Sequence, residues 1–196
     1  MSVAYRLMYL LGFTPWDGVH PQELTEIIEG PDALPPGRAL DVGSGKGAKA
    51  IYMATHGWKV TAVDNVPRAV AQARKRAEAA RATVDFRVGD VTRLPDLGLA
   101  PGFDLMIDFG CFHGLKAAQR DAYARGVTAL AAPSARLLMM AFGKAIPPVS
   151  SGVSEAELTT RFGDSWTLLW SHPDRSTEST AAMKRAAPNW YCLSRR

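Results

Sequence analysis

The sequence predicts an α/β protein with a doubly wound, mostly parallel sheet of seven strands. Short apolar runs alternate with stretches of helical periodicity, which is the pattern of repeated strand–helix–strand units. The chain has 196 residues, 47% of them hydrophobic and 21% charged, which suits one domain with one core. The last two apolar runs have no helical pattern between them, so we expect them to form an antiparallel hairpin at the end of the sheet.

The elements follow the chain in order. An apolar opening predicts a helix near 2–11, and the next helix, near 20–30, belongs with it to a helical cover (1–30) over the cofactor and substrate site of the single domain, 1–196. Apolar runs that end in acids predict strands near 38–42 and 58–63, and the helices that follow them are expected near 47–56 and 67–81. Further strands are expected near 84–88, 103–108, 134–142, 165–171 and 189–194, with helices near 117–131 and 154–162.

A glycine-rich turn follows the first strand and is the strongest functional signal. Its glycines allow a tight turn and let backbone N–H groups approach a ligand, while the helix that begins near 48 directs its positive end to the same place. Asp41 lies at the tip of the strand, where a carboxylate would repel a pyrophosphate but would suit a cationic amino group. The expected ligand is a nucleotide with an ammonium group, and the residues expected to hold it here are Asp41, Gly43, Ser44, Gly45 and Gly47.

Two further strand ends supply the rest of an adenosine site. A doubly wound sheet that binds a nucleotide is expected to place an acid at the end of its second strand, where it holds the ribose hydroxyls. Asp64, followed by Asn65, occupies that place. After the third strand, Asp90 could accept from the exocyclic amine of adenine, and Val91 could flank the ring.

These motifs resemble those of the class I S-adenosylmethionine-dependent methyltransferases. The resemblance runs from about residue 34 to 196: segment 40–47 is similar to the first motif, 63–64 to the second, 89–91 to the third and 103–108 to the fourth strand. It implies a Rossmann-like fold, S-adenosylmethionine as cofactor, S-adenosylhomocysteine as product and no metal. The short chain and the stretch 108–113 look most like the small-molecule enzymes of the thiopurine, halide and tellurite-resistance group. In similar enzymes an aromatic residue near the amino terminus closes over the cofactor, and the resemblance implies this role for Trp16.

Other interpretations of the glycine turn remain open. Gly43, Gly45 and Ala48 also satisfy the dinucleotide fingerprint, so a nicotinamide-dependent oxidoreductase is an alternative, although Asp41 disfavours it. A domain that binds S-adenosylmethionine without catalysis would keep the same turn. A phosphate-binding P-loop is excluded, because Gly45 and Lys46 are followed by a glycine where that motif needs serine or threonine.

The acceptor is expected to be small and lipophilic or aromatic, with an oxygen or sulfur nucleophile and less readily a nitrogen. The sulfonium is an activated methyl donor, so the protein must chiefly align the acceptor and exclude water. His113 is a candidate general base for a hydroxyl acceptor, and a structural histidine is the alternative. Asp108 could meet the methionine amino group or brace the loop after the fourth strand. The segments 5–16, 111–116, 144–153 and 171–188 are expected to form the acceptor side, the last two as long loops.

Composition excludes several other classes. The net charge of +4 comes from dispersed basic residues, so a nucleic acid is not the expected partner. Two cysteines and four scattered histidines predict neither a disulfide framework nor a metal site. The apolar opening is too short to span a bilayer and lacks a cleavage site, so we expect a cytoplasmic protein without stable membrane insertion. The oligomeric state cannot be predicted.

Overall fold

A computed structural model describes residues 21–147, 149–175 and 185–196 of the chain. The expected helix near 2–11 and Trp16 lie outside these residues. The elements are α2 (Gln22–Glu29), β1 (Arg38–Val42), α3 (Ala48–Thr55), β2 (Lys59–Asp64), α4 (Pro67–Ala79), β3 (Val84–Val88), the 3-10 helix η1 (Val91–Leu97), β4 (Phe103–Phe109), the 3-10 helix η2 (Phe112–Gly114), α5 (Ala117–Leu130), β5 (Ala131–Phe142), β6 (Ala145–Ile146), β7 (Ser150–Ser151), α6 (Glu155–Phe162), β8 (Trp166–Pro173) and β9 (Pro188–Arg195).

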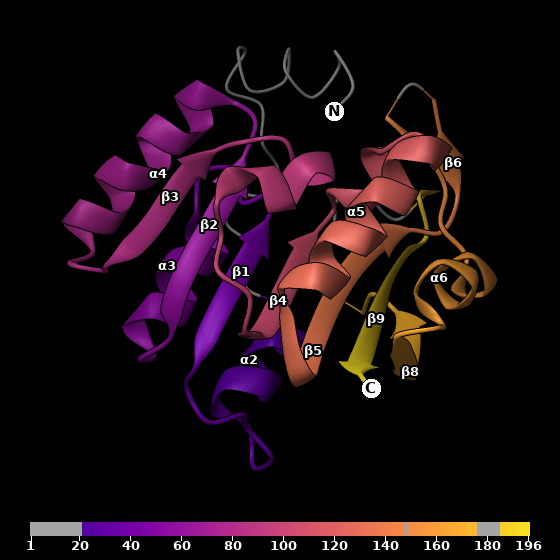
Figure 1. Ribbon diagram of the computed structural model, residues 1–196, viewed down its shortest axis with the longest axis horizontal. Helices are drawn as coiled ribbons and strands as arrows, with labels where there is room; N and C mark the ends of the chain where they lie inside the picture. The colour runs from indigo at the N-terminus through magenta and orange to yellow at the C-terminus, as the bar shows by residue number, and fades with distance from the viewer. Residues whose placement is uncertain (1–20, 148, 176–184) are drawn as a thin grey trace.

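Seven strands form one sheet in the order β3-β2-β1-β4-β5-β9-β8 (Figure 1). Strands β1 to β5 are parallel, and β9 is antiparallel to both of its neighbours, β5 and β8. The chain moves outward through β2 and β3 and then returns to β4 on the other side of β1. The carboxyl ends of β1 and β4 therefore flank a topological switch point, which is where open α/β sheets bind their ligands.

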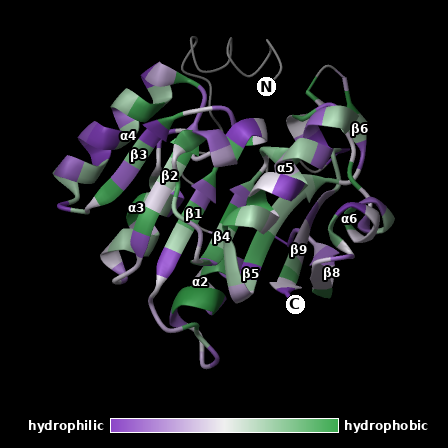
Figure 2. Cartoon of the chain, in the orientation of Figure 1, coloured by the Kyte–Doolittle hydropathy of each residue, from purple (hydrophilic) through white to green (hydrophobic). Residues whose placement is uncertain are grey.

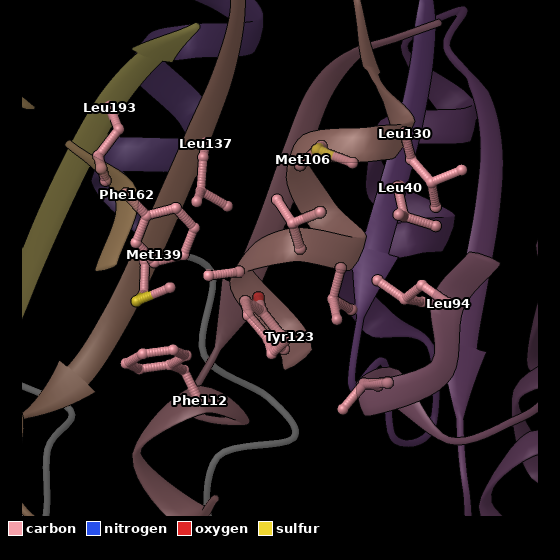
Figure 3. Close-up of a cluster of buried hydrophobic side chains, with 14 of the residues drawn as sticks. Leu40, Leu94, Met106, Phe112, Tyr123, Leu130, Leu137, Met139, Phe162 and Leu193 are labelled. Carbon is pink, nitrogen blue, oxygen red and sulfur yellow. The ribbon is translucent and has the colours of Figure 1, made fainter. Parts of the chain in front are cut away.

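Helices cover both faces of the sheet. One core cluster packs α2, α3 and α4 on one face, with Met53, Val70 and Trp190 among its buried members. The other packs η1, α5 and α6 on the opposite face, and Figure 3 shows part of it, with Phe112 and Tyr123 close to one another. Figure 2 shows hydrophobic residues concentrated on the central strands and mixed colouring along α4. The charged residues of α4 are exposed, whereas Ala69, Val70, Ala73 and Ala77 are buried.

The predicted seven-stranded architecture with an antiparallel carboxy-terminal pair is confirmed, and most boundaries agree within two residues. Strand β5 is longer than expected and begins at Ala131, which pairs with Phe103. The register then shifts, and Ser134 takes a φ of 62°, so the strand contains a bulge beside Pro133. Proline is tolerated at a bulge because no ladder hydrogen bond is lost there. The strand therefore begins before residue 134, where its start was expected.

One expectation for a loop is corrected, and helix α2 is found in the core. Residues 144–153, expected to be a long loop, contain the short antiparallel ladder β6–β7. Helix α2 packs on the face of the sheet, where Leu24 and Ile28 join the same core cluster as α3 and α4, and residues 1–20 of the expected cover lie outside the described chain. The apolar residues of α2 recur at helical spacing, so they form one face that the core buries. Within the described residues, no helix is long and apolar enough to cross a membrane.

Candidate cofactor and acceptor site

The glycine turn leaves β1 with three left-handed residues in alternate positions. Gly43, Gly45 and Gly47 have φ values of 80°, 55° and 77°, which residues other than glycine rarely adopt. The Gly43 and Ser44 amides both donate to the Val63 carbonyl of β2, at 2.8 and 3.1 Å. The turn is therefore anchored to the neighbouring strand before helix α3 begins.

Close packing is a second reason for two of these glycines. A Cβ at Gly47 would lie 2.7 Å from the Phe86 ring of β3, and one at Gly43 would lie 2.5 Å from the Cβ of Cys111. Real Cβ atoms do not approach so closely. The glycines thus bring the turn against β3 on one side and against the loop after β4 on the other.

Asp64 fixes the same turn from the end of β2. One oxygen accepts from the Gly45 amide at 2.9 Å, and the other accepts from the Val66 amide at 2.8 Å. The side chain is 4% exposed, and burial raises its pKa while the two amide donors oppose the rise. Each carboxylate oxygen keeps a second lone pair, so Asp64 could still accept from ribose hydroxyls. The sequence did not reveal its role in bracing the turn.

Asp41 is buried at the end of β1. It is 3% exposed, and burial raises the pKa of its carboxyl to about 7, against the opposing charge of Lys49. Its Oδ2 atom, the Ser44 hydroxyl and the Asn65 carbonyl oxygen have no hydrogen-bond partner within the described part of the chain. Buried polar atoms are almost always paired. These three unpartnered atoms occur at predicted cofactor positions, so the residues present fit a polar ligand at the turn.

Asp108 braces the loop after β4. It accepts hydrogen bonds from the amides of Cys111 at 2.7 Å and Phe112 at 3.0 Å, and from the Tyr123 hydroxyl at 2.7 Å. Burial raises the pKa of its carboxyl to about 6, and the Tyr123 hydroxyl opposes the rise. Of the two roles expected for Asp108, the structure displays the bracing one.

His113 is held inside the protein. It is 1% exposed, its Nδ1 accepts from the Phe142 amide at 3.2 Å, and its ring stacks on Phe142 with centroids 4.0 Å apart. Burial, reinforced by the Arg120 guanidinium, lowers its pKa to about 3. The surroundings of His113 are those of the structural histidine that the sequence left as the alternative to a base.

The two residues expected beside adenine are placed differently. Asp90 is exposed, and its Oδ1 caps η1 by accepting from the amide and hydroxyl of Thr92 at 2.9 and 2.8 Å. Val91 is 7% exposed and belongs to the core cluster under α5. Its side chain is committed to the core, so a contact of Val91 with a purine would be left to its backbone.

Sequence reasoning missed Arg120, which ties the expected acceptor loops together. Arg120 is 3% exposed, and its guanidinium lies over the Phe112 ring. It donates hydrogen bonds to the carbonyls of His113, Leu115 and Gly152, the Ser151 hydroxyl and the Glu157 carboxylate, at 2.8 to 3.1 Å. These partners join the loop after β4, the β6–β7 ladder and α6. A lone arginine on a helix gave no signal of this role.

Lys49 was missed as well, although its position gave a signal. It is the second residue of α3, in the first turn, where the helix dipole disfavours a cation. The residue is nevertheless 7% exposed, and its Nζ lies 4.1 Å from the centroid of the Phe109 ring at the end of β4. A buried lysine thus faces the switch point between β1 and β4.

Comparison with known proteins shows the family of this chain. Residues 39–134 match a family model described as a methyltransferase domain. The chain is 32% identical over 160 residues to the 2-heptyl-1-hydroxyquinolin-4(1H)-one methyltransferase of Mycobacteroides abscessus, which covers 79% of this chain and 69% of that protein. The chain therefore belongs to the class I S-adenosylmethionine-dependent methyltransferases. This assignment confirms the resemblance and sets aside the nicotinamide-dependent oxidoreductase.

Solved structures share the fold. A structure from work on the conversion of a disulfide bond into a thioacetal group during echinomycin biosynthesis aligns with a TM-score of 0.77 at 23% identity, over 100% of this chain and 93% of that one. The Burkholderia thailandensis 1,6-didemethyltoxoflavin-N1-methyltransferase aligns with a TM-score of 0.75 at 21% identity, over 98% and 85%. Among the described residues there is no group of three or more potential metal ligands.

Proposed function

We propose that this chain transfers the methyl group of S-adenosylmethionine to an oxygen or sulfur atom of a small, lipophilic or aromatic molecule in the cytoplasm. The relation to an enzyme named for a hydroxyquinolinone supports a small aromatic acceptor. The dispersed basic residues disfavour a nucleic-acid acceptor.

The cofactor seat follows from the unpartnered atoms at the glycine turn. In this proposal Asp41 accepts from the methionyl ammonium, Ser44 and the turn amides contact the rest of the methionyl part, and Asp64 with Asn65 binds the ribose hydroxyls. Asp90 accepts from the adenine amine through the carboxylate oxygen that does not cap η1. We assign Asp108 to bracing, since its oxygens already accept from two amides and a hydroxyl.

The surroundings of His113 and Asp108, the two titratable residues considered beside the loop after β4, support an acceptor that needs no general base from them. His113 is neutral at ordinary pH, and its Nδ1 accepts a backbone hydrogen bond. Asp108 is saturated by donors from the loop and from Tyr123. When bound, the cofactor supplies a methyl group already activated by its sulfonium. In this proposal the chain's own residues orient the acceptor and exclude water, and the acceptor ionises by itself. This favours thiols, N-hydroxy groups and acidic aromatic hydroxyls over alcohols.

A graded set of acceptors tests this conclusion. Thiophenols, N-hydroxy heterocycles and phenols of increasing pKa are incubated with radiolabelled S-adenosylmethionine, and kcat/KM is followed against pH. We expect the inflection to follow the pKa of each acceptor and to stay in place in His113→Gln, whose amide oxygen can still accept from Phe142. A fixed inflection near pH 6.5 that disappears in His113→Gln would restore His113 as the base. Cofactor binding without turnover of any acceptor would favour the non-catalytic alternative.

A further inference from the structure

The burial of Lys49 requires an explanation. A lysine in the first turn of a helix meets the positive end of the helix dipole, and removing its charge from water costs several kcal/mol unless anionic or aromatic groups compensate. Lys49 is only 7% exposed in the first turn of α3. By contrast Lys59, at the start of β2, is exposed to solvent. Lys49 therefore occupies a position that its chemistry disfavours.

The surroundings of Lys49 hold its charge beside the cofactor seat. Its ammonium lies over the face of the Phe109 ring, with Nζ 4.1 Å from the centroid, which is a favourable cation–π arrangement. Phe109 ends β4, and Asp41 lies near the end of the adjacent strand β1. The charge of Lys49 is also the largest influence that lowers the pKa of Asp41 against burial. A buried cation and a buried carboxylate thus occur together at the switch point.

This juxtaposition matches the amino-acid end of the cofactor. An α-amino acid carries an ammonium and a carboxylate on one carbon, so its recognition needs an acidic and a basic protein group close together. Asp41 has an oxygen without a hydrogen-bond partner in the described chain. We propose that Lys49 binds the methionyl carboxylate of S-adenosylmethionine while Asp41 binds the ammonium. This inference rests on the proposed cofactor seat and adds a residue that the glycine, ribose and adenine motifs do not include.

The pair also explains why the buried charges are retained. Without ligand, Lys49 and Asp41 partly neutralise one another, and each would be costly alone in this environment. With ligand, each meets the opposite charge of the zwitterion, so the site remains neutral. A nucleoside without the carboxylate would leave Lys49 without its ligand anion. The site should therefore select the complete amino acid over its decarboxylated form.

Isothermal titration calorimetry with two cofactors tests the inference. S-adenosylmethionine and its decarboxylated form share adenosine, sulfonium and terminal ammonium and differ only in the carboxylate. Their ratio of Kd values cancels any effect of a variant on Asp41, because both ligands carry the ammonium. In the wild type we expect the complete cofactor to bind at least about tenfold more tightly, as for a hydrogen bond between charged groups. In Lys49→Met, which keeps the stem beside Phe109, we expect the two Kd values to become equal within about twofold.

Two control variants complete the experiment. Lys49→Arg keeps the charge and should retain most of the preference, while Lys59→Met removes a surface lysine and should leave both Kd values unchanged. An unaltered ratio in Lys49→Met, or an equal loss for both ligands, would overturn the role of Lys49. Failure of the wild type to bind either ligand would instead overturn the cofactor seat itself. Binding of the decarboxylated form by Lys49→Met also shows that this variant is folded.

Discussion

Protonation of Asp41 should couple cofactor binding to pH. Burial raises the pKa of this carboxyl to about 7 from an ordinary value of 3.8, whereas a bound ammonium would favour the ionised form. At pH 6 about nine in ten ligand-free molecules would carry the proton, and binding must release it. Affinity should therefore fall by up to about tenfold per pH unit below 7 and change little above pH 8.

The assay is calorimetric titration with S-adenosylhomocysteine in pairs of buffers that differ in ionisation enthalpy. The buffer dependence of the heat gives the number of protons released, which we expect to be about 0.9 at pH 6 and about 0.1 at pH 8. Asp41→Asn should release none from this site and should bind more weakly at pH 8. A proton count near zero at pH 6, or an equal count in Asp41→Asn, would refute the reasoning.

Asp41 also makes the stability of the ligand-free protein depend on pH. The folded pKa of Asp41 is raised, so its contribution is fully favourable below the unfolded pKa near 4 and is lost as pH rises through about 7. The loss of unfolding free energy is at most on the order of 4 kcal/mol, because folding raises the pKa of Asp41 by roughly three. In denaturant titrations of the ligand-free protein, the wild type should lose stability relative to Asp41→Asn between pH 4 and pH 8. Parallel pH dependence of the two proteins would contradict the assigned pKa.

Three substitutions test the supports of the site. Gly47→Ala should lower the free energy of unfolding in urea by several kcal/mol, because a Cβ at this position has no room. In the control Gly98→Ala the Cβ meets nothing within 4 Å, so only about 1 kcal/mol of left-handed backbone strain is expected. Equal losses in the two variants would mean that packing at Gly47 is unimportant. Tyr123→Phe should cost about 1–3 kcal/mol by leaving Asp108 short of a buried donor, and an unchanged urea midpoint would contradict this. Arg120→Met should lower the free energy of unfolding by about 3–5 kcal/mol and reduce kcat/KM for the acceptor more than it reduces cofactor affinity. A selective loss of cofactor binding in calorimetry would contradict the assignment of Arg120 to the acceptor loops.

The sequence predicts the parts of this protein that depend on local pattern. The number and ranges of the strands and the glycine turn follow from apolar periodicity, from acids at strand ends and from glycines that must take positive φ. These signals lie within short windows, so β1, α3 and β2 appear close to their expected boundaries. The same locality explains the correct expectation of an antiparallel strand pair at the end of the sheet.

The remaining features depend on partners far apart in the chain. The bracing contact of Asp108 depends on Tyr123, which lies on the next helix and donates to its carboxylate. Arg120 donates hydrogen bonds to Ser151 and Glu157, which lie beyond β5 in the chain. Histidine is a common general base, and the burial of His113 against Phe142 is a contact that spacing in the sequence does not reveal. Such roles cannot be predicted from spacing, because unrelated side chains could occupy the same distances in the sequence.

The position of β9 between β5 and β8 has a consequence for how the protein folds. Strand β9 pairs with β5 from Arg136–Ser194 to Phe142–Pro188, and β1 pairs with β4 at Ala39–Leu105. These two pairings close the longest loops of chain, whereas β1–β2, β2–β3 and β8–β9 join strands that lie closer in sequence. Contacts of large sequence separation form slowly, because the loop entropy is lost before the pairing energy is gained. We expect β1, β2 and β3 with the glycine turn, and the β8–β9 pair, to become structured before the β1–β4 and β5–β9 pairings join them (Figure 1). A refolding intermediate should therefore protect the amides that link β1, β2 and β3 from hydrogen exchange earlier than those that link β9 to β5.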